Sequence, residues 1–81
     1  MTRHRVLLFA RYAELFGDTS VEIDVPDNST AGDCIDALRA TPGGALLPAR
    51  PLLAVNRTVV APAFGVRTGD ELALLPPLAG G

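Results

Sequence analysis

One stretch of the sequence, residues 30–41, carries a well-formed amphipathic helix pattern. Its apolar residues recur at i, i+3, i+4 and i+7, which places them on one helix face: Ala31, Cys34, Ile35 and Leu38. Thr30 is a good N-cap residue, and Asp33 three positions later gives a capping-box pattern with Asp in place of the usual Glu. Residues 42–44, Pro-Gly-Gly, end the helix. A helix with one apolar stripe must bury that stripe against another layer.

Two extended segments precede this helix. Residues 5–10 form an apolar run bounded by polar residues, which is typical of a strand covered on both faces. Residues 21–25 alternate strictly between apolar side chains and carboxylates, which predicts a strand with one buried face. Residues 11–16 fit two turns of helix with Ala13 and Phe16 facing inward, and Gly17 is a suitable helix stop. We therefore expect a hairpin with a short helix in its connection.

Three extended segments follow the main helix: residues 52–56, a short edge strand at 59–60, and residues 71–75. Residues 43–51 between them are irregular, with room for one helical turn. The order strand, strand, helix, strand, short strand, strand predicts an α+β fold in which a mixed sheet packs against one main helix. This is the β-grasp, or ubiquitin-like, arrangement. We expect a β-grasp domain over residues 1–75 and an extended, flexible tail over residues 76–81.

The composition agrees with one small domain. The chain has 81 residues, of which 48% are hydrophobic and 20% are charged, and this balance argues against disorder. The net charge of −2 argues against a nucleic-acid binder. The apolar run near the N-terminus is too short for a signal region or a membrane span, so no membrane partner is expected. A single cysteine, Cys34, leaves no internal disulfide and fits a cytoplasmic location.

The end of the sequence is the most informative feature for function. Pro76 and Pro77 favour an extended path away from the sheet. Gly80 and Gly81 have no side chains, so the backbone there can pass through a channel too narrow for a Cβ atom. We therefore expect the carboxylate of Gly81 to be presented on a slender, projecting arm.

A main-chain carboxylate at Gly81 is suited to group transfer. Activation with ATP converts a carboxylate into an acyl-adenylate, and attack by a sulfur nucleophile then yields a thiocarboxylate as AMP leaves. A thiocarboxylate stays ionised at neutral pH and is a good nucleophile. None of this chemistry needs a side chain from the domain. We therefore expect Gly81, with Gly80 beside it, to be the reacting site and no cofactor to be bound.

Five short blocks of the sequence carry a family resemblance. They are VLLFA at 6–10, ELFG at 14–17, LAVN at 53–56, TGDE at 68–71 and LPPLAGG at 75–81. Each block is weak alone, but in this order and spacing they span nearly the whole chain. The sequence resembles the small subunits of molybdopterin synthase, the MoaD-like sulfur carriers of molybdenum-cofactor biosynthesis.

The resemblance implies a function and a set of partners. An adenylyltransferase related to ubiquitin-activating enzymes would use ATP to activate Gly81, and a sulfurtransferase would supply sulfur. The thiocarboxylate would then enter a molybdopterin synthase large subunit, in a heterotetramer, and donate sulfur to the cyclic pyranopterin precursor. The catalytic side chains belong to the large subunit in this family, so this chain is expected to be a non-catalytic, sulfur-donating subunit.

The family also docks its partners through an apolar patch on the exposed sheet face. The positions that match this patch are Phe9, Val59 and Leu75. In the last strand, Leu72 and Leu74 should point one way and Ala73 and Leu75 the other, which leaves Leu75 exposed if the helix covers the first face. The tail residues expected to contact partners are Pro76, Pro77, Leu78 and Ala79.

Two other residues invite a functional interpretation. Cys34 lies on the apolar stripe of the helix, where a cysteine acts as a small buried hydrophobe, so we do not expect it to carry sulfur. His4 precedes the first apolar run without a partner nearby in sequence and is predicted to be a solvated end residue. No Cys/His cluster has metal-ligand spacing, so no metal site is expected.

Three alternative functions remain open on the sequence alone. Sulfur carriers for thiamine or cysteine biosynthesis would share the chemistry at Gly81, although the thiamine carriers usually lack the Pro-Pro step. A ubiquitin-like modifier would be joined through Gly81 to lysines of target proteins. A plain interaction domain would have an incidental tail, and deleting Gly80 and Gly81 would leave its function intact.

Overall fold

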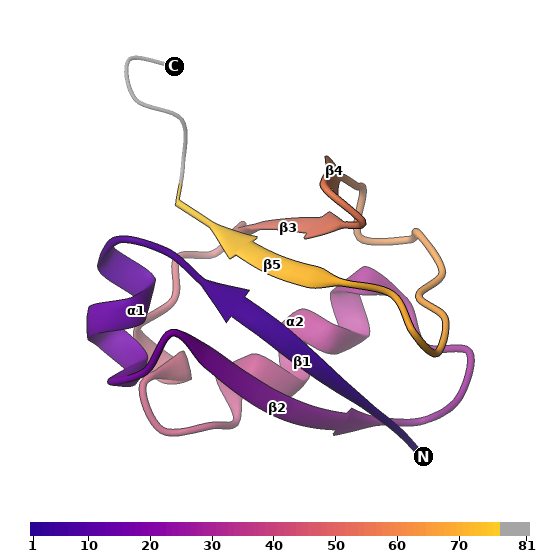
Figure 1. Ribbon diagram of the computed structural model, residues 1–81, viewed down its shortest axis with the longest axis horizontal. Helices are drawn as coiled ribbons and strands as arrows, with labels where there is room; N and C mark the ends of the chain where they lie inside the picture. The colour runs from indigo at the N-terminus through magenta and orange to yellow at the C-terminus, as the bar shows by residue number, and fades with distance from the viewer. Residues whose placement is uncertain (77–81) are drawn as a thin grey trace.

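Five strands form one mixed sheet in this computed structural model, which describes residues 1–76 (Figure 1). The sheet order is β2-β1-β5-β3-β4, with β1 parallel to β5 and the other pairs antiparallel. The strands are β1 (Thr2–Leu8), β2 (Ser20–Val25), β3 (Leu52–Val55), β4 (Thr58–Val59) and β5 (Leu72–Leu75). The helices are α1 (Arg11–Phe16), α2 (Ala31–Arg39) and the 3-10 turn η1 (Gly44–Leu46).

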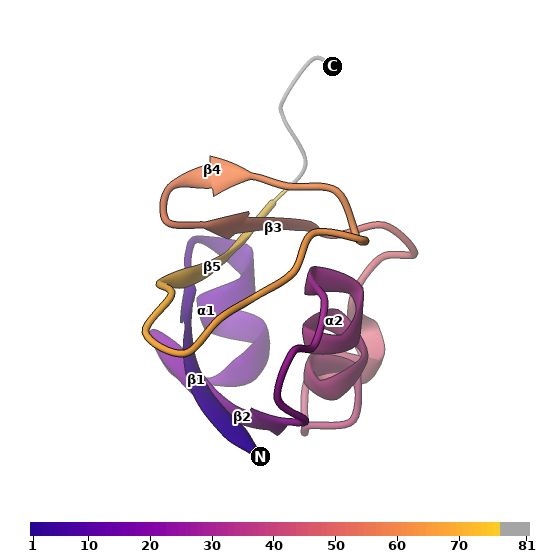
Figure 2. The same cartoon turned by 90° about the vertical axis from the view of Figure 1, so that its right-hand side faces the viewer.

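Helix α2 covers one face of the sheet and leaves the other face open (Figures 1 and 2). This arrangement confirms the expected β-grasp fold and the expected order of its elements. Most boundaries differ by one or two residues, and β1 begins three residues earlier than expected. Glu71 and Asn56 fall outside β5 and β3, and the edge strand is Thr58–Val59 rather than residues 59–60.

Helix α2 begins with the predicted capping box. The Asp33 backbone N–H donates to Thr30 Oγ1 at 3.2 Å, and the Thr30 backbone N–H donates to Asp33 Oδ2 at 2.9 Å. These bonds satisfy two backbone donors at the helix start that have no intrahelical partner. The predicted stripe is also confirmed, since Ala31, Cys34 and Leu38 are buried and Ile35 is half-buried at its edge.

Helix α1 ends as predicted at Gly17, whose φ of 77° is the left-handed conformation that glycine adopts without strain. Its inward face differs from the prediction. Ala13 and Phe16 pack against the core but stay half-buried, and the buried residue is Tyr12. The Tyr12 hydroxyl has no hydrogen-bond partner among residues 1–76, and burial raises its pKa.

Strand β1 corrects two sequence predictions. It is not covered on both faces, because Arg3 and Arg5 are exposed on its outer side. The prediction that His4 is a solvated end residue is also wrong, since only 4% of its surface is exposed. The strand begins at Thr2, so His4 pairs with Ile23 and shares the inner face with Val6. Alternation along a strand therefore turns His4 toward the core.

The irregular segment after α2 depends on two glycines. Gly43 has a φ of 90°, and Gly44 lies so close to the end of α2 that a Cβ there would be 1.8 Å from the Leu38 carbonyl oxygen. These positions let η1 pack against both helices. No helix among residues 1–76 has the length and apolarity needed to cross a bilayer.

Candidate functional site

An apolar row crosses four strands on the open face of the sheet. Leu7 pairs with Ala73, Ala73 with Ala54, and Ala54 with Val59. Partners across neighbouring strands lie on the same face, so these four side chains form one line from β1 to β4. Ala54 is buried within the row, whereas Val59 at its edge is 50% exposed.

Phe9 and Leu75 extend this row toward the end of β5. Each lies two residues beyond a member of the row, and a step of two along extended chain keeps a side chain on the same face. Phe9 follows β1 and is 47% exposed, and Leu75 is half-exposed opposite Leu52. The predicted placement of Phe9, Val59 and Leu75 on the uncovered face is therefore confirmed.

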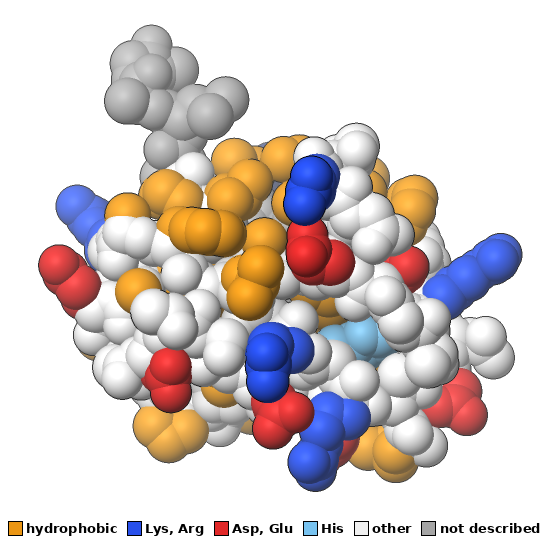
Figure 3. Space-filling model, in the orientation of Figure 1, with side chains coloured by type: hydrophobic (Ala, Val, Ile, Leu, Met, Phe, Trp, Pro, Cys, Tyr) orange, Lys and Arg blue, Asp and Glu red, His pale blue; other side chains and the backbone are white. Residues whose placement is uncertain are grey.

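We call this surface the sheet patch and define it by seven residues: Leu7, Phe9, Leu52, Ala54, Val59, Ala73 and Leu75. Figure 3 shows hydrophobic side chains gathered on this face, over β5, β3 and the end of β1. Strand alternation already placed Ala73 on the face of Leu75, whereas sequence reasoning missed Leu7, Leu52 and Ala54. Leu7 could have been found by alternation with Phe9, but the others required the register between strands.

Charged pairs flank the sheet patch. On the β1–β2 side, Arg3 and Asp24 are opposite each other, and Arg3 Nε donates to Asp24 Oδ1 at 2.9 Å. This hydrogen bond holds the pKa of Asp24 below its usual value. On the β4 side, Arg57 Nε and Glu71 Oε1 are 3.7 Å apart. The apolar area is thus confined to β5, β3, β4 and the end of β1.

Pro76 is the last described residue and directly follows the sheet patch. The predicted reacting residues, Gly80 and Gly81, and the predicted contact residues Pro77, Leu78 and Ala79 lie outside the described part of the chain. The structure therefore shows the point where the tail starts, at the end of β5, which runs parallel to its neighbour β1 (Figure 1).

Cys34 is separated from solvent. Its side chain is fully buried in the core as a free thiol, as predicted. Burial, with a smaller contribution from Asp33, raises the pKa of the thiol. A buried neutral thiol is a poor nucleophile, so Cys34 is unsuited to sulfur transfer. Within residues 1–76, no group of three or more His, Cys, Asp or Glu side chains could hold a metal ion.

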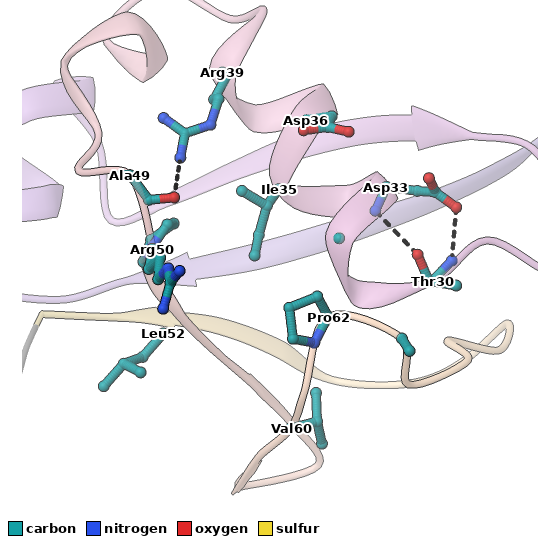
Figure 4. Close-up of a pocket in the computed structure, with 13 residues that line it drawn as sticks. Thr30, Asp33, Ile35, Asp36, Arg39, Ala49, Arg50, Leu52, Val60 and Pro62 are labelled. Atoms are coloured by element: carbon teal, nitrogen blue, oxygen red, sulfur yellow. Dashed lines mark hydrogen bonds between the residues drawn. The ribbon is translucent and has the colours of Figure 1, made fainter.

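A hollow of about 850 Å³ lies between α2 and the β3–β4 edge (Figure 4), and Pro76 is not part of its lining. Its apolar lining includes Ile35, Val60 and Pro62. Arg39 at its rim donates to the carbonyl oxygens of Leu47, Pro48 and Ala49 at 2.6 to 3.2 Å. We interpret Arg39 as a structural residue, because these bonds tie the irregular segment to α2.

Residues 6–81 match the ThiS family. This chain belongs to that family. The match covers both the strands of the sheet patch and the Pro-Pro-Leu-Ala-Gly-Gly segment that follows β5. The matched residues therefore include every residue of the sheet patch.

Two curated relatives of this ThiS-family chain differ in their names. The molybdopterin synthase sulfur carrier subunit of Arabidopsis thaliana is 36% identical, over 95% of this chain and 81% of that protein. Small archaeal modifier protein 1 of Haloferax volcanii is 41% identical, over 91% of this chain and 95% of that protein. A crystal structure of the Haloferax volcanii modifier matches with a TM-score of 0.83 and 30% identity, covering 96% of this chain and 100% of that one.

Proposed function

We propose that this chain is the sulfur carrier subunit of a molybdopterin synthase. The observation that carries the proposal is the sheet patch, an uncovered apolar face that continues to Pro76, where the tail starts. An uncovered apolar surface on a small domain marks a protein interface. Its position lets a partner bind the domain and receive the tail in one encounter. The relatives named as sulfur carrier subunits support this assignment.

The reacting group in this proposal is the Gly81 carboxylate. Its oxygen attacks the α-phosphorus of ATP and pyrophosphate leaves, which gives the acyl-adenylate. A sulfur nucleophile then attacks the acyl carbon, AMP leaves, and a thiocarboxylate results. The thiocarboxylate donates its sulfur to the cyclic pyranopterin precursor, and water restores the carboxylate. The domain itself supplies recognition, and its buried Cys34 stays out of the reaction.

Three protein partners follow from this chemistry. They are a large subunit that receives the thiocarboxylate, an adenylyltransferase that uses ATP, and a sulfurtransferase. We propose a heterotetramer with the large subunit and a cytoplasmic location, the latter supported by the free thiol of Cys34. No partner nucleic acid or membrane is part of the proposal.

Sulfur transfer can be tested directly. The protein would be prepared with a thiocarboxylate at Gly81 and mixed with a large subunit and the cyclic pyranopterin precursor, and molybdopterin would be measured. Product is expected from this form and not from the carboxylate form or from a chain lacking Gly81. No product, with the large subunit shown to be active with another carrier, would reject the molybdopterin assignment and leave a thiamine carrier, a cysteine carrier or a protein modifier.

Protein modification is a second candidate function, favoured by the similarity to small archaeal modifier protein 1. It uses the same activated Gly81 but transfers the acyl group to a lysine amine rather than releasing sulfur. Conjugates linked through Gly81 in a cell lysate, detected as branched peptides by mass spectrometry, would support it. Their absence from cells that contain the thiocarboxylated protein would count against it.

A further inference from the structure

A groove of about 550 Å³ is lined by Pro76, where the tail starts, and by residues of α1 and of the segment around η1. Helix α1 lies on the same side of the sheet as the end of β5 (Figure 1). The groove runs between α1 and the η1 segment. Most of its lining is apolar, and Pro76 belongs both to this lining and to the segment that directly follows Leu75 of the sheet patch. The residues that matter here are Arg11, Leu15, Leu46, Pro48 and Pro76.

Leu46 is presented at the rim of this groove with 74% of its surface exposed. Its turn is held in place, because the Gly44 N–H donates to the Thr41 carbonyl oxygen at 2.9 Å and the Leu47 N–H donates to the Gly44 carbonyl oxygen at 3.1 Å. Leu47, the next residue, is buried in the core. A fixed turn thus exposes a large apolar side chain that contributes little to the fold, next to an apolar groove.

Arg11 gives the groove a charge. It is exposed at the start of α1, and no carboxylate among residues 1–76 lies within 4.0 Å of its guanidinium. A partner that covers this rim would bind more tightly with a carboxylate near Arg11, since an ion pair becomes stronger as water is displaced. The groove therefore favours an occupant with an apolar side chain and an acidic neighbour.

We propose that this groove is a recognition site for the ATP-dependent enzyme that adenylates the tail. This enzyme seats an apolar side chain between Leu15, Leu46 and Pro48 and places a carboxylate at Arg11. The inference rests on the proposed function. The adenylating enzyme must select its carrier before any sulfur is attached, and two terminal glycines offer no side chain to recognise. Contacts beside the base of the tail supply that selection.

The test is carrier-dependent exchange of pyrophosphate into ATP by the purified adenylating enzyme, which needs no sulfur source. Leu46→Asp is expected to raise the carrier concentration for half-maximal exchange about tenfold, and Arg11→Glu about fivefold, with the maximal rate unchanged. Phe64→Asp is the matched control. Phe64 is 47% exposed, but it lies in the loop that contacts the start of α2 and should leave exchange unchanged.

The outcomes separate this inference from the proposed function. If the unsubstituted chain supports no exchange, activation of Gly81 itself fails. If it supports exchange and both groove variants match it, or Phe64→Asp is equally impaired, the groove has no role in recognition. The assignment would also be overturned if the groove variants supported normal exchange but were impaired in the later transfer of sulfur, because the groove would then serve the large subunit. Thermal melts verify folding, and Leu46→Ala replaces Leu46→Asp if the latter is unfolded.

Discussion

The side chain of Asn56 donates a hydrogen bond of 2.9 Å from Nδ2 to Oδ1 of Asp70. Asn56 Oδ1 also accepts from the Glu71 N–H at 2.9 Å, and Asp70 Oδ2 accepts from the Arg67 N–H at 2.8 Å. These bonds join the β3–β4 turn to the turn before β5. They fix the turn that leads into β4, whose Val59 pairs with Ala54 on β3, the strand that lies between β4 and β5.

Asn56→Ala should destabilise the domain by about 2 to 3 kcal/mol, since it removes two side-chain hydrogen bonds and places alanine at a left-handed φ. The φ of Asn56 is 51°, a conformation that asparagine tolerates. Asn56→Gly is the matched control, because it loses the same bonds without the strain. In urea unfolding, Asn56→Gly should be about 1 kcal/mol more stable than Asn56→Ala. Equal stabilities would show that backbone strain at this position is unimportant.

Asp70 should make the free energy of unfolding depend on pH in the acidic range. The Arg67 N–H and, second, the Asn56 side chain lower the pKa of Asp70 in the folded state. Because the folded pKa lies below the unfolded one, this stabilisation is complete above the unfolded pKa of about 3.9 and is lost as pH falls through the folded pKa. Asp70→Asn should therefore be less stable at pH 7, with a shallower loss of unfolding free energy below about pH 4. Parallel profiles would contradict this role.

Local sequence patterns predicted most of the fold. The capping box at Thr30 and Asp33, the glycine stop at Gly17 and the helical stripe all depend on neighbours within one turn of helix. His4 was mispredicted because its burial depends on where β1 begins and on its pairing with Ile23, a partner far away in sequence.

The candidate site was predictable only in part for the same reason. Phe9, Val59 and Leu75 were predicted through a family resemblance and strand alternation. Alternation along the last strand also placed Ala73 on the face of Leu75, but Ala54 joins them only through the register of β3 with β5, which no local pattern specifies. The groove beside Pro76 brings α1 together with η1, so its existence depends on packing between segments about thirty residues apart.

Gly44→Ala should be strongly destabilising. The added Cβ would lie 1.8 Å from the Leu38 carbonyl oxygen, so the backbone at the end of α2 would have to move. We expect a loss of at least about 3 kcal/mol in unfolding free energy, or no folded protein. A Cβ at Gly65 would meet no atom within 4 Å, so Gly65→Ala should stay within about 0.5 kcal/mol of the unsubstituted chain. A stable Gly44→Ala protein would contradict the close packing of η1 on α2.

Val59→Asp should weaken docking of the carrier to the large subunit. It places a charge in the sheet patch, where binding would remove the carboxylate from water without a partner. In the molybdopterin assay, the carrier concentration for half-maximal rate should rise about tenfold. Phe64→Asp serves as control, since Phe64 is similarly exposed but is not part of the sheet patch. Unchanged transfer by Val59→Asp would place the docking surface elsewhere.

Cys34→Ala should still accept sulfur at Gly81. The thiol is fully buried and its pKa is raised by burial, so it neither reaches a sulfur donor nor ionises readily. The substitution should cost about 1 kcal/mol of stability through lost apolar burial. Thiocarboxylation is measured by mass spectrometry as exchange of one oxygen for sulfur, with a chain lacking Gly81 as the negative control. A folded Cys34→Ala protein that fails to gain sulfur would show that the thiol takes part, and the main-chain mechanism would have to be abandoned.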